Sequence, residues 1–92
     1  MRATTFPLGR LVATPGALQA LAESSQSPGF FLARHVSGDW GLVDEEDRLL
    51  NDEALRDGSR LLSAYETERG VRLWIITEAD RSATTILLPD EY

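Results

Sequence analysis

The spacing of apolar residues changes at Gly58 of this 92-residue chain. From residue 15 to Gly58 the apolar residues recur at helical spacing, and after Gly58 they alternate at period two, which is typical of strands. Three strand segments follow, at residues 60–66, 71–77 and 83–88, and their connections are too short for helical crossovers. This part of the chain therefore predicts an antiparallel meander.

The middle segment, residues 71–77, is apolar on both of its faces, because Leu73 and Ile75 alternate with Trp74 and Ile76. A strand of this kind is typical of the interior of a sheet, where both faces are covered. We expect the sheet face that lacks helices to remain partly apolar, which would mark a dimer or partner surface.

Three helices are predicted before Gly58, at residues 15–24, 28–36 and 44–57. Thr14-Pro15 and Ser27-Pro28 each combine an N-cap residue with proline at the first helical position, and acidic residues crowd the first turn of the third helix. A first strand is expected at residues 8–13. The predicted order is β-α-α-α-β-β-β, an α+β two-layer fold with three helices packed on one face of a mainly antiparallel four-stranded sheet, its first strand at an edge.

Composition and length indicate one globular domain, residues 1–92, since 42% of the residues are hydrophobic and 26% are charged. The absence of cysteine excludes disulfides and thiolate chemistry. No apolar run approaches the ~20 residues of a membrane span, and the first residues lack the apolar region of a signal peptide. The sequence therefore predicts a cytoplasmic protein that does not enter a membrane.

The formal net charge is −6, and all nine basic residues are arginines scattered along the chain. Binding to a phosphate backbone needs clustered positive charge, so direct nucleic-acid binding is not expected. An acidic surface has a second interpretation, in which the protein imitates DNA and occupies a DNA-binding protein.

The first polar cluster spans residues 34–41 and contains a histidine, an acid and an indole. His35 could act as a general base that Asp39 orients. In the structural interpretation, His35 interacts with the dipole at the end of a helix, Asp39 caps the turn, and Trp40 fills the core. Both interpretations stay open at this point.

The second polar cluster spans residues 77–85, around a predicted hairpin. Glu78 and Thr84 could face each other there, and a glutamate with Arg81 and hydroxyl groups can cleave RNA by acid–base catalysis. The alternative is a polar hairpin tip, held by Asp80 in its own turn and by a Glu78–Arg81 pair. The candidate catalytic residues are Glu78, Arg81 and His35, and the candidate binding residues are Asp39, Trp40, Asp80, Ser82 and Thr84.

No glycine-rich phosphate loop or dinucleotide fingerprint is present. His35 is the only histidine, and there is no cysteine, so no metal site and no cofactor are expected.

Four long stretches carry a family resemblance: FPLGRLVATPGALQAL, FLARHVSGDWG, LRDGSRLLSAY and LWIITEADRSATTILLPDEY. They cover nearly the whole chain and are similar to a small bacterial family whose members are often labelled only as uncharacterised or plasmid-related. The resemblance implies a bacterial cytoplasmic protein that is accessory to a mobile element or a host-defence system. The family has no assigned catalytic residue, so the resemblance implies no site.

Three functions follow as hypotheses. The first is a non-enzymatic protein-interaction or regulatory module, which would bind a protein partner or form a homo-oligomer. The second is a small ribonuclease-like phosphodiester enzyme that uses residues 78–85, and the third is an acidic DNA mimic.

Overall fold

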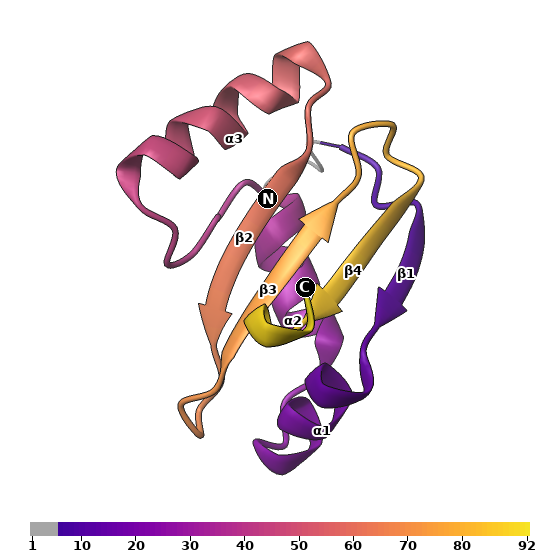
Figure 1. Ribbon diagram of the computed structural model, residues 1–92, viewed down its shortest axis with the longest axis vertical. Helices are drawn as coiled ribbons and strands as arrows, with labels where there is room; N and C mark the ends of the chain where they lie inside the picture. Colours follow the sequence, from indigo (N-terminus) through magenta and orange to yellow (C-terminus); the bar gives the residue numbers. More distant parts are fainter. Residues whose placement is uncertain (1–5) are drawn as a thin grey trace.

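A computed structural model describes residues 6–92 as a four-stranded sheet with helices on one side (Figure 1). The elements are β1 (Arg10–Ala13), α1 (Pro15–Glu23), α2 (Pro28–Val36), α3 (Glu45–Asp57), β2 (Leu61–Glu66), β3 (Arg72–Thr77), β4 (Ala83–Leu87) and the 3₁₀ turn η1 (Pro89–Glu91). The predicted α+β fold is confirmed. No helix among the described residues is long and apolar enough to cross a membrane.

The strands lie in the order β1-β4-β3-β2. β2, β3 and β4 form the expected antiparallel meander with β3 inside the sheet, and β1 lies at an edge. β1 runs parallel to β4, which makes the sheet mixed. The chain returns from β1 to β4 through all three helices and two strands, and such a long connection allows a parallel pairing.

The helix starts follow from their capping residues. The side chain of Thr14 accepts a hydrogen bond from the Ala17 N–H at 3.2 Å, and Ser27 accepts one from Phe30 at 3.3 Å. Asp44 caps α3 in the same way. α3 ends where Gly58 adopts a left-handed φ of 81°, which favours glycine.

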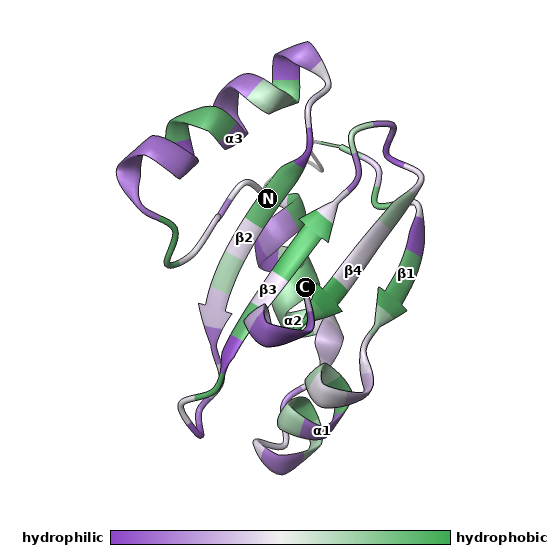
Figure 2. Ribbon diagram, viewed as in Figure 1, coloured by the Kyte–Doolittle hydropathy of each residue, from purple (hydrophilic) through white to green (hydrophobic). Residues whose placement is uncertain are grey.

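Two apolar clusters join the helices to the sheet. α2 lies behind the sheet in Figure 1 and α1 lies below it in the view, and both helices join one apolar cluster with the sheet. α3 lies beside β2 and is mostly hydrophilic (Figure 2). Only the side of α3 that faces the sheet contributes residues to an apolar cluster. The first cluster contains Ala17, Ala20, Leu21, Phe31, Tyr65, Leu73, Ile75 and Ile86, and the second contains Phe6, Trp40, Ala54 and Leu61.

The C-terminal turn crosses the opposite face of the sheet (Figure 1). The ring of Tyr92 lies 5.9 Å from the ring of Trp74, and Ile76 and Leu87 are buried on this side. The face that we expected to lack a cover is therefore apolar, and a short segment of the chain covers part of it.

The outer edge of β2 has backbone partners of its own. Asn51 on α3 donates to the Leu62 carbonyl oxygen at 2.6 Å, and its own side-chain oxygen accepts from the Leu62 N–H at 3.0 Å. Residues 40–42 bond to both backbone groups of Ala64, at 3.1 and 2.6 Å. Gly41 permits this approach, because a Cβ atom there would lie 2.1 Å from the Ala64 carbonyl oxygen. The outward backbone groups of Leu62 and Ala64 are therefore already bonded, which hinders pairing of this edge with a further strand.

We expect Asn51→Ala to lower the free energy of unfolding by about 1–3 kcal/mol, because the substitution leaves a peptide N–H and C=O without partners. Urea denaturation monitored by circular dichroism would measure the change. Glu53→Ala, an exposed position on the same helix, is the matched control and should change the stability by less than about 0.5 kcal/mol. Equal effects of the two substitutions would contradict this role of Asn51.

Candidate functional site

His35 lies in the core, at the contact between α2 and the sheet. Its side chain is 0% exposed. Its Nδ1 atom is 2.5 Å from the Ser63 hydroxyl oxygen on β2, and its Nε2 atom is 2.9 Å from the Thr77 hydroxyl oxygen on β3. Both ring nitrogens therefore have partners inside the protein.

The hydrogen bonds continue from His35 to the segment that precedes β1. The Thr77 and Thr84 hydroxyl oxygens are 2.8 Å apart, and the Thr84 hydroxyl donates to the Leu8 carbonyl oxygen at 2.7 Å. We call the series Ser63, His35, Thr77, Thr84 and the Leu8 carbonyl the buried polar chain. It connects β2, α2, β3 and β4 with the start of the described chain.

The donor and the acceptor of each bond in the buried polar chain follow from the Leu8 carbonyl oxygen, which can only accept. The Thr84 proton is used on the Leu8 carbonyl, so Thr77 must donate to Thr84 and accept from His35. His35 then carries its proton on Nε2, and its Nδ1 accepts from the Ser63 hydroxyl. Each donor has one acceptor when the imidazole is neutral.

Burial lowers the pKa of His35 to about 4, so the imidazole is neutral at pH 7. Aromatic rings surround it, with Phe6 at 5.3 Å and Trp40 at 5.7 Å, both edge to face. A general base must come within hydrogen-bond reach of the substrate proton. His35 is enclosed and fully bonded, and this geometry matches the structural interpretation, although its neutral ring replaces the expected cation at the helix end.

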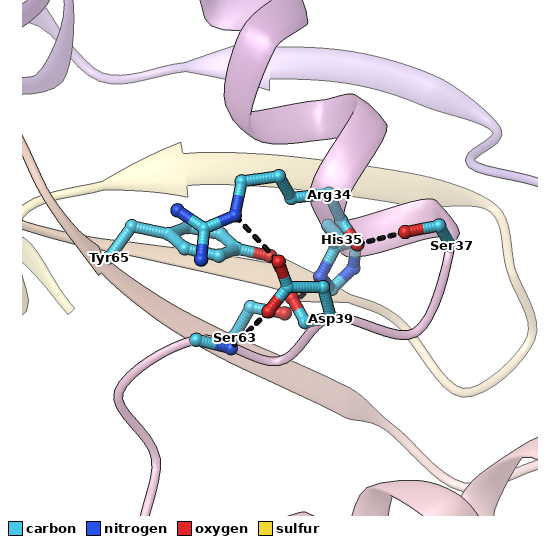
Figure 3. A network of polar contacts seen from close by, with 7 residues as sticks. Arg34, His35, Ser37, Asp39, Ser63 and Tyr65 are labelled. Carbon is cyan, nitrogen blue, oxygen red and sulfur yellow. Dashed lines mark hydrogen bonds and ion pairs between the residues drawn. The ribbon is translucent and has the colours of Figure 1, made fainter.

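Asp39 contacts Arg34 (Figure 3), and the ring nitrogens of His35 are bonded to Ser63 and Thr77 instead. The Arg34 Nε atom lies 2.7 Å from the carboxylate, and the guanidinium covers the Tyr65 ring at 4.6 Å. The other carboxylate oxygen of Asp39 accepts from the Gly41 N–H, and its backbone oxygen accepts from the Tyr65 hydroxyl at 2.6 Å. Burial raises the pKa of Tyr65 to about 12, so this hydroxyl remains a donor. Asp39 fixes the turn after α2.

Trp40 is buried in the second apolar cluster, and its indole N–H donates to Asp52 on α3 at 3.0 Å. Its side chain therefore connects the turn after α2 to α3. This placement agrees with the expectation that Trp40 fills the core.

Arg81 holds the hairpin between β3 and β4 to the end of α3. Its guanidinium donates to the carbonyl oxygens of Ala54 at 3.0 Å and Ser59 at 2.7 Å. It also donates to the carbonyl oxygens of Glu78 and Ala79, within its own turn. The expected pair between the Glu78 and Arg81 side chains is replaced by these bonds to backbone oxygens.

Asp80 and Ser82 belong to the same turn. The Asp80 carboxylate accepts from the Ser82 N–H at 3.0 Å, and hydrogen bonds from Ser82 lower the pKa of Asp80. This is the self-bonded hairpin tip of the structural alternative.

Glu78 and Thr84 do not face each other, which corrects the expected pairing. Thr84 pairs with Thr77, and both are 0% exposed on the helix side of the sheet. Glu78 pairs with Ala83 through its N–H and lies on the opposite face, beside Thr85. A shift of one residue reverses the face of every side chain in a strand.

The two polar clusters therefore meet, but they meet inside the core. His35 reaches Thr77 and Thr84, while Glu78 is exposed on the other face of the sheet. Sequence reasoning did not single out Ser63 or the Leu8 carbonyl. The sequence did contain a sign that Ser63 is a buried polar residue, because it is a small polar residue at an inward position of a mostly apolar strand.

Among residues 6–92, two of the surface hollows lie next to the sheet. The first, which we call the β1 groove, has a volume of about 250 Å³ and lies between β1 and α2. The second has a volume of about 290 Å³ and lies near the C-terminal turn, where Arg60, Glu78, Thr85 and Tyr92 contribute polar groups. The β1 groove is lined by Leu11, Val12, Ala13, Pro28, Leu32, Thr84 and Ile86.

Among residues 6–92, no group of three or more histidine or acidic side chains is placed to hold a metal ion. Comparisons with protein families, curated proteins and solved structures found no significant match to this chain.

We expect wild-type stability to fall by about 2 kcal/mol between pH 7 and pH 5 through His35. The folded pKa, about 4, is below the unfolded value of 6.5, so the unfolded state takes up the proton first as the pH falls. The stabilisation is complete above pH 6.5 and is lost as the pH falls towards 4.

Urea denaturation at both pH values would measure this loss in the wild type and in His35→Gln. The variant cannot titrate at this position, so its loss should be smaller by the same amount. A wild-type loss no larger than that of the variant would show that His35 is not held neutral.

We expect Arg81→Lys to lower the free energy of unfolding by about 1–3 kcal/mol, because one ammonium nitrogen cannot replace both guanidinium nitrogens, one of which bonds Ala54 while the other bonds Ser59 and the hairpin turn. Glu78→Ala should change the stability by less than about 0.5 kcal/mol. Thermal and urea denaturation would compare the two variants. An unchanged stability of Arg81→Lys would contradict the structural role of the guanidinium.

Proposed function

We propose that this protein is a small, non-enzymatic protein-interaction module that binds its partner through the edge of β1 that no strand among residues 6–92 covers. The supporting observation is the difference between the two edges of the sheet. Both outward backbone groups of Leu62 and of Ala64 on β2 have partners, as described above. At the other end of the sheet, β1 lies outermost (Figure 1).

The ladder to β4 determines which backbone groups of β1 point outward. Arg10 donates to the Ser82 carbonyl oxygen at 2.9 Å, and Thr14 donates to that of Ile86 at 3.0 Å. Since alternate residues of a strand bond to the same neighbour, the N–H and C=O groups of Leu11 and Ala13 point away from the sheet. They form a template for an added strand.

Apolar side chains accompany this backbone template. Leu11 is 57% exposed and Val12 is 40% exposed, on opposite faces of β1. The β1 groove lies directly beside Leu11 and Ala13 and has almost entirely apolar walls. In strand addition, backbone hydrogen bonds supply affinity and such pockets receive alternate side chains of the partner.

The geometry supports the phosphodiester-enzyme hypothesis less well. Its candidates do not share a cleft: His35 is enclosed, Arg81 is bound to backbone oxygens, and Glu78 lies on the other face. The DNA-mimic hypothesis stays a prediction, based on the charge of −6 alone. A role as an accessory to a mobile element or a host-defence system is supported by the sequence resemblance alone.

A tagged pull-down from the native host's lysate, with and without nuclease, tests the proposal. We expect one dominant protein, which can be an untagged copy of the same chain, to be retained after nuclease treatment. Leu11→Pro should lose it at least about tenfold, because proline removes an outward N–H without removing a bond to β4. Leu49→Asp on α3 is the matched control, since Leu49 is 52% exposed.

Equal retention by Leu11→Pro and by the wild type would show that β1 is not the binding edge. Loss of every partner after nuclease treatment would contradict a protein-interaction module and indicate a nucleic-acid ligand.

A further inference from the structure

We infer that the partner at the β1 edge is a second copy of this chain, paired antiparallel to the first about a two-fold axis through Val12. The inference rests on the proposed function and names its partner. Its products are a symmetric dimer and a continuous sheet that crosses the interface.

The hydrogen-bonding groups of β1 are self-complementary in this arrangement. Val12 bonds to β4 and would lie opposite Val12 of the second copy as a pair without mutual hydrogen bonds. Leu11 would then lie opposite Ala13 of the second copy and exchange both backbone hydrogen bonds with it. Because the axis repeats this exchange, every outward N–H and C=O of residues 11 and 13 gains a partner.

The side chains on the helix face also fit. Leu11 and Ala13 lie on that face with their β4 partners, Thr84 and Ile86. A large exposed side chain of one copy thus lies opposite a small one of the other. Leu11 would pass over Ala13 of the second copy and enter its β1 groove, where Pro28 and Leu32 form the helix-side wall. The same contact occurs twice.

Charges at the two ends of β1 are complementary across the axis. Arg10 lies at one end and, among residues 6–92, has no ion-pair partner. At the other end, Glu91 accepts hydrogen bonds from the Thr14 hydroxyl and from the Gly16 N–H. These bonds lower the pKa of Glu91, so it is ionised. The antiparallel register places Arg10 opposite Thr14 of the second copy and therefore beside Glu91 of that copy.

The interface would be small, because β1 has only four residues, and two copies would each carry a net charge of −6. Both features predict a reversible equilibrium instead of a permanent dimer. Sedimentation equilibrium should show a mass that rises from 10.2 kDa towards twice that value over about 10 μM to 1 mM.

Two variants test the edge, and Leu49→Asp again serves as the matched control. We expect Leu11→Pro to remain monomeric over this range, and Arg10→Glu to raise the dissociation constant about tenfold, because two ion pairs become repulsive. The control should match the wild type. Circular dichroism confirms that each variant is folded.

Single-cysteine variants test the register, since the chain has no cysteine of its own. Val12→Cys places two thiols opposite each other at a Cα distance of about 4.5 Å, which permits a disulfide. Leu11→Cys places them on a diagonal at about 7–8 Å, which is too far. We expect mild oxidation to cross-link Val12→Cys at least about tenfold faster than Leu11→Cys or Leu49→Cys.

A wild-type chain that stays monomeric to 1 mM, or equal cross-linking at the three positions, would overturn the inference. These results leave the proposed function testable on its own. If the pull-down still yields a different protein that Leu11→Pro loses, the β1 edge binds a heterologous partner and only the inferred dimer is wrong.

Discussion

The buried polar chain from Ser63 through His35, Thr77 and Thr84 to the Leu8 carbonyl is the interaction on which the rest of the structure depends. Inside a core, an unpaired polar group is strongly unfavourable, so each member of this chain requires the next. The requirement fixes how β2, β3 and β4 are aligned, because a shift of one residue would remove a hydroxyl from its partner. It also fixes the rotation of α2 and the path of the chain into β1. The apolar contacts around the buried polar chain stabilise the fold by burying apolar surface. The polar chain determines which single alignment of the strands and of α2 is stable.

The features that the sequence predicted well are local ones. Thr14-Pro15, Ser27-Pro28 and the residues around Asp44 determine where helices begin, because each cap bonds to a backbone N–H only three residues away. The alternation in residues 71–77 likewise placed β3 inside the sheet, since both of its faces needed a cover. Helix caps and strand alternation can be recognised from sequence because all the residues that define them lie close together in the chain.

The features that the sequence could not determine depend on distant partners. From the sequence alone, a threonine such as Thr84 fits an exposed hairpin tip as well as a buried core position. Thr84 is buried because it bonds Thr77, which in turn bonds His35, a residue far away in the sequence. Arg81 is similar, because its acceptors at Ala54 and Ser59 are carbonyl oxygens, which carry no mark in the sequence. The parallel pairing of β1 with β4 joins the two ends of the described chain. The expected facing of Glu78 and Thr84 was wrong for the same reason, because the strand register that sets the face of Glu78 depends on partners in β4.

The unequal edges of the sheet limit how large any assembly through β1 can become. Growth of a fibre by strand addition needs two free edges on every subunit, so that each newcomer offers a fresh template to the next. Asn51 and the segment around Gly41 remove one of the two. Pairing through β1 would consume the other, and the combined sheet would end at a capped strand on both sides. A chain with one bonded edge and one exposed edge strand could therefore form a dimer without growing into a fibre.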